Sequence, residues 1–157
     1  MPFLDTLLSL RRRALAIAGK LDWLPPLLLR ACLAAVFVPT GWGKLHDLGK
    51  VTAYFTELGI PAPHLNAVVV AFCELVCGSL LLVGFLSRLA AIPLVVSMTV
   101  AIVTARRPDI GGVVDLFALD EFIYLAMAVV VIVMGAGAVS VDAQLARRVK
   151  WPMNEPR

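Results

Sequence analysis

The chain has 157 residues, of which 61% are hydrophobic and 16% are charged, and its formal net charge is +3. Soluble domains average about 45–50% apolar and about 25% charged residues, because most of their surface must face water. Here the apolar residues are gathered into four long blocks separated by short polar stretches. This composition excludes a soluble globular domain and favours an all-α integral membrane protein. The small net charge gives no reason to expect nucleic-acid binding.

The first 22 residues predict an interfacial amphipathic helix on the cytoplasmic side of the membrane. One face of this helix carries leucine and alanine, and the other carries arginine, lysine and short polar residues. A cleaved signal peptide would need its positive charge before its apolar core, whereas Arg11, Arg12 and Arg13 follow Leu7 and Leu8. We therefore expect this leader to be retained.

The four apolar blocks predict four transmembrane helices, each close to the 20 or so residues that cross a hydrocarbon core of about 30 Å. Pro39, followed by Gly41 and Gly43, predicts a kink near the end of the first helix. Together the helices form a four-helix bundle in a domain of residues 23–145, between the leader at 1–22 and a basic tail at 146–157. The predicted spans are residues 27–44, 65–86, 89–105 and 122–141.

Lysine and arginine are distributed unevenly about these spans. If the N-terminus is cytoplasmic, nine of them fall in inside segments and four in outside segments. This positive-inside bias predicts a multi-pass protein of the bacterial inner membrane with both termini in the cytoplasm. The first outside loop is expected to hold a short helix at residues 51–58.

Three ionisable residues, Arg30, Lys44 and Glu74, fall within the predicted spans. Charges at this depth are expensive and are expected to have partners. With the spans set side by side, Glu74 lies at the depth of Ala35, roughly 7 Å from Arg30 but roughly 13 Å from Lys44 along the helix axis. We therefore predict that Glu74 faces the bundle interior and pairs with Arg30, while Lys44 meets acidic residues or headgroups at the outer rim.

Two interpretations of Glu74 stay open. It could form a structural clamp between the first two spans, or it could handle a proton or bind the polar head of a lipophilic ligand such as a quinone. A carboxyl group in an apolar setting favours its protonated form unless a cation stays close, so it could act as a proton donor.

The cysteines and histidines provide no recognisable redox or metal motif. Cys73 and Cys77 are four residues apart, which differs from the C-x-x-C redox signature, and small apolar packing residues are the favoured interpretation. A thiol pair between Cys77 and Cys32 on the adjacent span stays open. His46 and His64 lie in outside segments, and no metal cluster, P-loop or Ser/His/Asp set is present. The motifs therefore predict no cofactor.

The end of the fourth span has a distinct pattern, G-A-G-A-V-S-V-D. Gly135 and Gly137 are expected to loosen the helix there. Ser140 or Asp142 is expected to cap a following cytoplasmic helix that begins at about Ala143.

Four parts of the chain resemble the DoxX family of small bacterial membrane proteins: LLLRACLAAVFVPTGWGKL, YFTELGIPAPHLNAVVVAFCELVCGSLLLVGFLSRLAA, EFIYLAMAVVVIVMGAGAVSVDAQL, and the tyrosine-phenylalanine loop with its L-G-I-P turn. The G-A-G-A-V-S-V-D ending is the most specific part, and the resemblance extends from Leu27 to Leu145. It implies a four-helix membrane bundle of the kind described as a component of membrane oxidoreductase systems linked to sulfur compounds and quinones. The family's polar residues fall on Arg30, Lys44, Glu74, Arg88, Ser140 and Asp142.

The sequence and the resemblance together lead to one functional expectation. The chain would be an accessory or quinone-linked component of a membrane redox assembly, without a self-contained catalytic motif. Arg30, Lys44 and Glu74 are the candidates for a ligand or proton site, and no residue is assigned as catalytic or as a metal ligand. The remaining polar residues of the resemblance, Arg88, Ser140 and Asp142, are expected to be structural.

Two alternatives belong to other functional classes. A non-catalytic structural subunit or assembly factor would contact a larger complex or a second copy through small-residue faces, such as those at Ala31, Ala34 and Ala35 or at Gly135 and Gly137. A small-solute or lipid carrier is disfavoured, because four spans leave little room for the repeats of transporters. The expected partners are membrane lipids and either a membrane protein or another copy of the chain.

Overall fold

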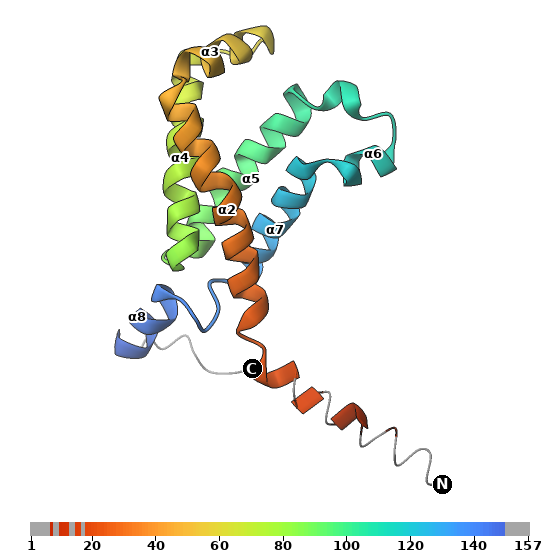
Figure 1. The fold of residues 1–157 in the computed structure, drawn as a ribbon, viewed down its shortest axis with the longest axis vertical. Helices are drawn as coiled ribbons and strands as arrows, with labels where there is room; N and C mark the ends of the chain where they lie inside the picture. The colour runs from red at the N-terminus through yellow and green to blue at the C-terminus, as the bar shows by residue number, and fades with distance from the viewer. Residues whose placement is uncertain (1–6, 8–9, 13–14, 17, 150–157) are drawn as a thin grey trace.

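The computed structural model describes residues 7, 10–12, 15, 16 and 18–149, and the described residues form helices and turns without strands (Figure 1). This confirms the all-α prediction. The leader predicted at residues 1–22 and the tail predicted at 146–157 lie in large part outside the described residues. The elements are α2 (Leu24–His46), α3 (Leu48–Glu57), α4 (Pro63–Val83), α5 (Ser87–Thr104), the 3-10 turn η1 (Arg107–Asp109), α6 (Val113–Ala118), α7 (Asp120–Met134) and α8 (Val141–Val149).

Three of the described helices, α2, α4 and α5, are long and apolar enough to cross a membrane. Their bounds agree with the first three predicted spans to within three residues at each end. Pro25 and Pro26 lie in the first turn of α2, where the missing amide hydrogen costs nothing, and the helix continues through Pro39. The turn between α4 and α5 is made by Gly84 and Leu86, which both adopt left-handed backbone conformations.

The predicted fourth span, residues 122–141, is wrong at its C-terminal end. Helix α7 has 15 residues and stops at Met134, so it is only about 22 Å long. Gly135, with φ of 83°, ends the helix, and an irregular segment at residues 135–140 leads to α8. The glycines that were expected to loosen this helix in fact terminate it.

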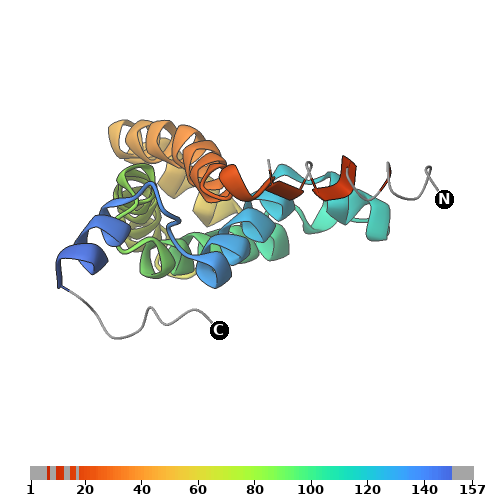
Figure 2. The ribbon, with the colours of Figure 1, turned by 90° about the horizontal axis from the view of Figure 1, so that it is seen from below.

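The helices pack as a bundle in which α2 lies along α4, while α5 contacts both α4 and α7. The α2–α4 contact depends on glycine: a Cβ atom at Gly41 would lie 2.9 Å from the backbone oxygen of Ala71, and one at Gly78 would lie 3.1 Å from Val38. Figure 1 shows α4 and α5 close together at the end that carries α8 and apart at the end that carries α3. Helix α8 leaves the bundle beside the end of α4, as Figures 1 and 2 both show.

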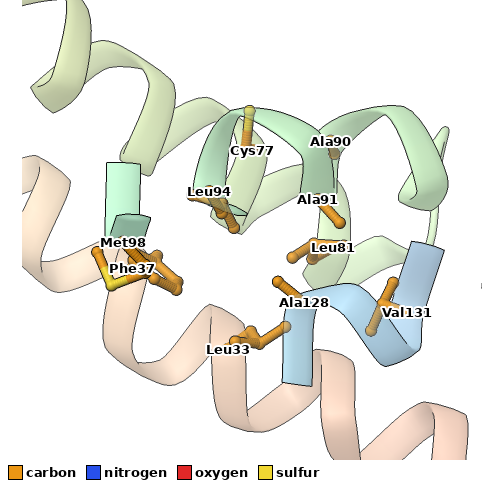
Figure 3. Packing of buried hydrophobic residues seen from close by; sticks show 10 residues of the cluster. All are labelled: Leu33, Phe37, Cys77, Leu81, Ala90, Ala91, Leu94, Met98, Ala128 and Val131. Carbon is orange, nitrogen blue, oxygen red and sulfur yellow. The ribbon is translucent and has the colours of Figure 1, made fainter. Parts of the chain in front are cut away.

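The end of the bundle that carries α8, where α4 and α5 lie close together, is its narrow half, and the opposite end, which carries α3, is its wide half. The apolar core lies in the narrow half, where side chains from four helices meet (Figure 3). Alanines on α5 and α7 let the backbones approach closely there. Cys77 is part of this core whereas Cys32 is exposed, and all three cysteines are free thiols, so the thiol pair does not form. The core residues are Leu33, Phe37, Cys77, Leu81, Ala90, Ala91, Leu94, Met98, Ala128 and Val131.

The wide half of the bundle is bordered by α3, which confirms the short helix expected in the first loop and packs against α4. Asp47 caps this helix: its Oδ1 accepts a hydrogen bond from the Lys50 amide at 3.2 Å, and its Oδ2 lies 3.0 Å from the Lys50 ammonium. These bonds to Lys50 lower the pKa of the Asp47 carboxyl below its ordinary value. At this end, where α4 and α5 separate, residues of α3, α4 and α5 line a cavity.

Candidate functional site

Glu74, on α4, is only 1% exposed, which confirms that it faces the bundle interior. Two side chains from other helices approach its Oε1 atom. Lys44, from the last turns of α2, donates to it at 2.5 Å, and the Ser97 hydroxyl of α5 lies 3.5 Å away. The carboxylate therefore joins three helices at the point where α4 and α5 begin to separate.

The predicted pairing of Glu74 with Arg30 is wrong, because Lys44 is the partner. The sequence argument had placed Ala35 at the depth of Glu74. In the structure, Gly41 instead packs directly on the α4 backbone beside Glu74. The difference of six residues slides α2 along α4 by about 9 Å, which brings Lys44 within reach and carries Arg30 away.

The second carboxylate oxygen of Glu74, Oε2, is buried and forms no hydrogen bond with any described residue. Leaving a buried acceptor unpaired costs about 1–3 kcal/mol, and more for a charged group. Lys44 is the nearest cation, and its side chain remains 32% exposed, so it can still reach solvent or a bound molecule. The protein thus supplies hydrogen-bond partners for only one of the two carboxylate oxygens of Glu74.

Glu74 and Lys44 line a cavity of about 1090 Å³ between α3, α4 and α5. This is as large as the pockets that hold drug-sized ligands, which span roughly 300–1,000 Å³. Glu74, Lys44 and Ser97 form its polar end. The apolar walls include Tyr54, Phe55, Leu58, Ile60, Val69, Val70, Val96 and Val100.

The lining of the cavity includes exposed valines from both α4 and α5. Val69 on α4 and Val96 on α5 line it and are themselves 47% and 57% exposed. In a membrane-spanning pair of helices, such exposed valines face hydrocarbon. The arrangement therefore suits an amphiphilic molecule that enters from the lipid, with its polar head at Glu74 and its apolar part along the valines.

One rim of the cavity carries an ion pair between the segment that follows α5 and the first turn of α7. Arg106 Nε lies 2.7 Å from Glu121 Oε1, and Arg106 also contacts Asp109 at 3.5 Å. The Glu121 carboxylate raises the pKa of Arg106. The prediction that Lys44 meets acidic residues or headgroups at the rim is therefore wrong: Glu121 pairs with Arg106, and Lys44 pairs with Glu74.

Arg30 lies at the narrow end of the bundle, where it is 1% exposed. Its guanidinium donates to the backbone oxygen of Leu81 at 3.2 Å and to that of Val139 at 2.5 Å. A Cβ atom at Gly84 would clash with this guanidinium and would lie 2.6 Å from the Ser140 side chain. Arg30 therefore fastens α2 to the end of α4 and to the segment after α7.

Ser140 and Asp142 take different roles at this junction. The Ser140 hydroxyl accepts the amide of Ala143 at 3.0 Å and caps α8, as predicted. The Asp142 carboxylate instead accepts the amides of Leu86 at 2.8 Å and Ser87 at 3.1 Å, at the start of α5. The sequence analysis did not predict this cap from a distant part of the chain. The one signal that could have indicated it was that α5 begins without a capping side chain of its own.

Arg88 and the two glycines after α7 also belong to the narrow end. The exposed guanidinium of Arg88 lies over Gly135, and Gly137 packs against Pro26, where a Cβ atom would approach to 2.7 Å. Ala34 is buried within the bundle. Several of the small residues that were proposed to contact a partner, Gly135, Gly137 and Ala34, thus contact other parts of this chain instead.

The structure divides the six predicted polar residues into two clusters. Lys44 and Glu74 meet at the cavity with Ser97, which the sequence analysis missed because a single serine in an apolar span carries no distinctive signal. The others, Arg30, Arg88, Ser140 and Asp142, gather at the narrow end. Within the described part of the chain, no group of three or more histidine, cysteine, aspartate or glutamate residues could hold a metal ion.

The family comparison covers α2 to α5, which carry Arg30, Lys44, Glu74 and Arg88 but not Ser140 or Asp142. The DoxX family model matches residues 26–107, about half of the chain. A segment of 81 residues, 50% of this chain, is 37% identical to the Uncharacterized membrane protein Rv3486 of Mycobacterium tuberculosis and covers 48% of that protein. The match therefore spans about half the length of this relative. No solved structure matches the chain.

Proposed function

This chain belongs to the DoxX family of membrane proteins, and from that premise we propose that it binds a quinone-type molecule in the cavity beside Glu74. It would serve as a quinone-linked accessory component of a membrane redox assembly. One observation carries the proposal: a buried carboxylate with a free oxygen stands at the polar end of a large cavity whose walls are apolar residues of helices long enough to cross a membrane.

The polar groups at this end complement both forms of a quinone head. The Lys44 ammonium and the Ser97 hydroxyl can donate to a quinone carbonyl. The free Oε2 of Glu74 can accept from the hydroxyl of the reduced quinol, which would supply the missing hydrogen bond. An isoprenoid tail would lie along the valine walls and leave through the gap between α4 and α5.

The proposal includes four membrane spans in the bacterial inner membrane, with α7 as the fourth and both termini in the cytoplasm. The support is the lysine and arginine bias of the loops together with the packing of the apolar α7 along α5. Reporter fusions after Arg157 and within residues 108–115 should indicate opposite sides of the membrane. Fusions that report the same side would overturn this topology.

The binding proposal is tested by purifying the full chain in mild detergent and titrating it with a short-chain quinone and its quinol. Glu74→Gln keeps the size of the side chain but removes its charge. Because a hydrogen bond to a charged group contributes about 1.5–3 kcal/mol, quinol affinity should fall roughly tenfold or more while protein yield is retained. Quinone extracted from membranes with the protein should fall in parallel.

Glu57→Gln is the matched control, because Glu57 is exposed at the end of α3 and does not line the cavity. It should bind quinol like the unmodified chain. Equal affinity of the Glu74 and Glu57 variants would exclude Glu74 from ligand binding. Purification with a stoichiometric membrane-protein partner and no quinone would instead support the structural-subunit alternative, with a partner helix filling the gap between α4 and α5.

A further inference from the structure

A second hollow lies at the opposite end of the bundle and plays no part in the proposed quinone site. It measures about 580 Å³ and is formed by the start of α5, the irregular segment at residues 135–140 and α8. Two arginines, Arg88 from α5 and Arg147 from α8, line it together with Asp142. Its charge pattern and its surroundings both indicate an anionic ligand.

The two arginines are available for such a ligand. Arg88 and Arg147 are exposed, and neither forms a hydrogen bond or ion pair with a described residue. Gly135 leaves room for the Arg88 guanidinium, because a Cβ atom at this position would lie 3.0 Å from the Nε atom of Arg88. Asp142 does not neutralise the arginines by direct contact, since its two oxygens accept the amides at the start of α5.

Backbone amides supply a second set of donors. Ala136, Gly137 and Ala138 line the hollow, and their amides donate to no backbone oxygen of the described residues. Unpaired amides at the edge of a membrane need an acceptor from water or from a ligand. Because the arginines and these three residues line the same hollow, an anion bound there would have both kinds of donor around it.

The rim of the hollow is apolar on the side of the bundle. Leu86, Leu89 and Met134 line it and are 45%, 61% and 54% exposed. Cationic donors beside an exposed apolar surface match a molecule with an anionic head and long hydrocarbon chains. A free phosphate ion would use the arginines but would leave this surface uncovered.

We propose that this hollow binds the headgroup of an anionic phospholipid. Its phosphodiester lies between Arg88 and Arg147, and its acyl chains run along Leu89 and Met134. Arginine suits this role because its planar guanidinium can donate two hydrogen bonds to one phosphate. This inference is independent of the quinone proposal, because the two cavities share no lining residue.

The test uses the full chain, stripped of lipid in detergent and titrated by native mass spectrometry with phosphatidylglycerol and with phosphatidylcholine of identical acyl chains. The unmodified chain should bind phosphatidylglycerol more tightly. Each arginine near an anionic headgroup contributes about fivefold in affinity, so the double variant Arg88→Gln/Arg147→Gln should lose roughly 25-fold. Arg148→Gln, a neighbouring exposed arginine outside the hollow, should retain the preference.

A second variant tests whether any loss of lipid binding results from misfolding around Gly135. Arg147→Glu changes only the exposed α8 and should abolish the preference for phosphatidylglycerol while leaving the melting temperature of the lipid-free protein unchanged. Equal affinity for the two lipids, or a double variant that binds like the unmodified chain, would overturn the proposal. Inorganic phosphate that displaces the lipid at a similar concentration would assign the hollow to a free anion and would overturn it as well.

Discussion

Arg30 and Glu74 are both 1% exposed and lie on two helices that pack along each other, yet their surroundings differ. Arg30 is held by backbone oxygens from two other parts of the chain and lines neither cavity. Glu74 is paired with one partly exposed lysine and lines a large cavity, and its Oε2 atom has no hydrogen-bond partner among the described residues. The comparison shows that burial alone does not identify a functional charge in a membrane protein.

The type of partner distinguishes the two charges. Backbone oxygens cannot leave Arg30 unless the helix ends move, so Arg30 reports on the integrity of the fold. Its Nε atom also lacks a hydrogen-bond partner among the described residues, but Arg30 lines neither of the two cavities described above. Lys44 can move away from Glu74 without disturbing a helix, so the Glu74 end can exchange partners with a ligand.

The largest expected effect comes from breaking the narrow end at Gly84. Gly84→Ala places a Cβ atom against the Arg30 guanidinium and Ser140, at a position where φ is +73°. Backbone strain and overpacking should together lower the free energy of unfolding by about 3 kcal/mol or more. Thermal unfolding in detergent should show this as a large fall in melting temperature or as a loss of folded protein.

Gly59→Ala separates the cost of backbone strain at a glycine from the cost of steric crowding around a new side chain. Gly59 also has a positive φ, of 69°, but no atom lies within 4 Å of the Cβ position. This variant should lose only about 1 kcal/mol, since it carries the left-handed conformation alone. Equal losses at the two glycines would show that the contact with Arg30 contributes nothing.

The second prediction tests directly whether Arg30 serves stability and Glu74 serves ligand binding. Arg30→Met removes the guanidinium and leaves the oxygens of Leu81 and Val139 unpaired, which should lower the free energy of unfolding by about 3 kcal/mol. The protein that still folds should bind quinol normally. Glu74→Gln should do the reverse, with a loss of stability of about 1 kcal/mol or less and weakened binding. Parallel losses of stability and binding in both variants would remove the distinction between the two ends.

The smallest expected effect concerns α3, which borders the cavity, and it depends on pH. Bonds to Lys50 lower the pKa of Asp47, so the folded state favours the charged carboxyl. The stabilisation of α3 is therefore present above the ordinary aspartate pKa, about 3.9, and is lost as the pH falls through the lower folded value. Amide exchange in α3 should accelerate on acidification relative to Asp47→Asn, in which the position cannot titrate. An identical pH dependence in the two proteins would contradict the cap.

The sequence determined the features that depend on local composition. Long apolar runs set the positions of α2, α4 and α5, because 20 or so apolar residues match the membrane thickness and a helix satisfies its own backbone. The single carboxylate in the second run had to face inward, since exposure to lipid would cost more than burial beside a cation. The cap of α8 could be narrowed to Ser140 or Asp142, because capping is a contact within one turn.

Only the tertiary structure decided the contacts that join distant segments. The choice of Lys44 over Arg30 depends on how far α2 slides along α4, and that register is set by the close approach at Gly41 rather than by the ends of the apolar runs. The cap that Asp142 provides to α5 crosses more than fifty residues of chain. The cavity beside Glu74 exists because α4 and α5 diverge, and the angle between packed helices is fixed by side-chain interdigitation that a single sequence does not display.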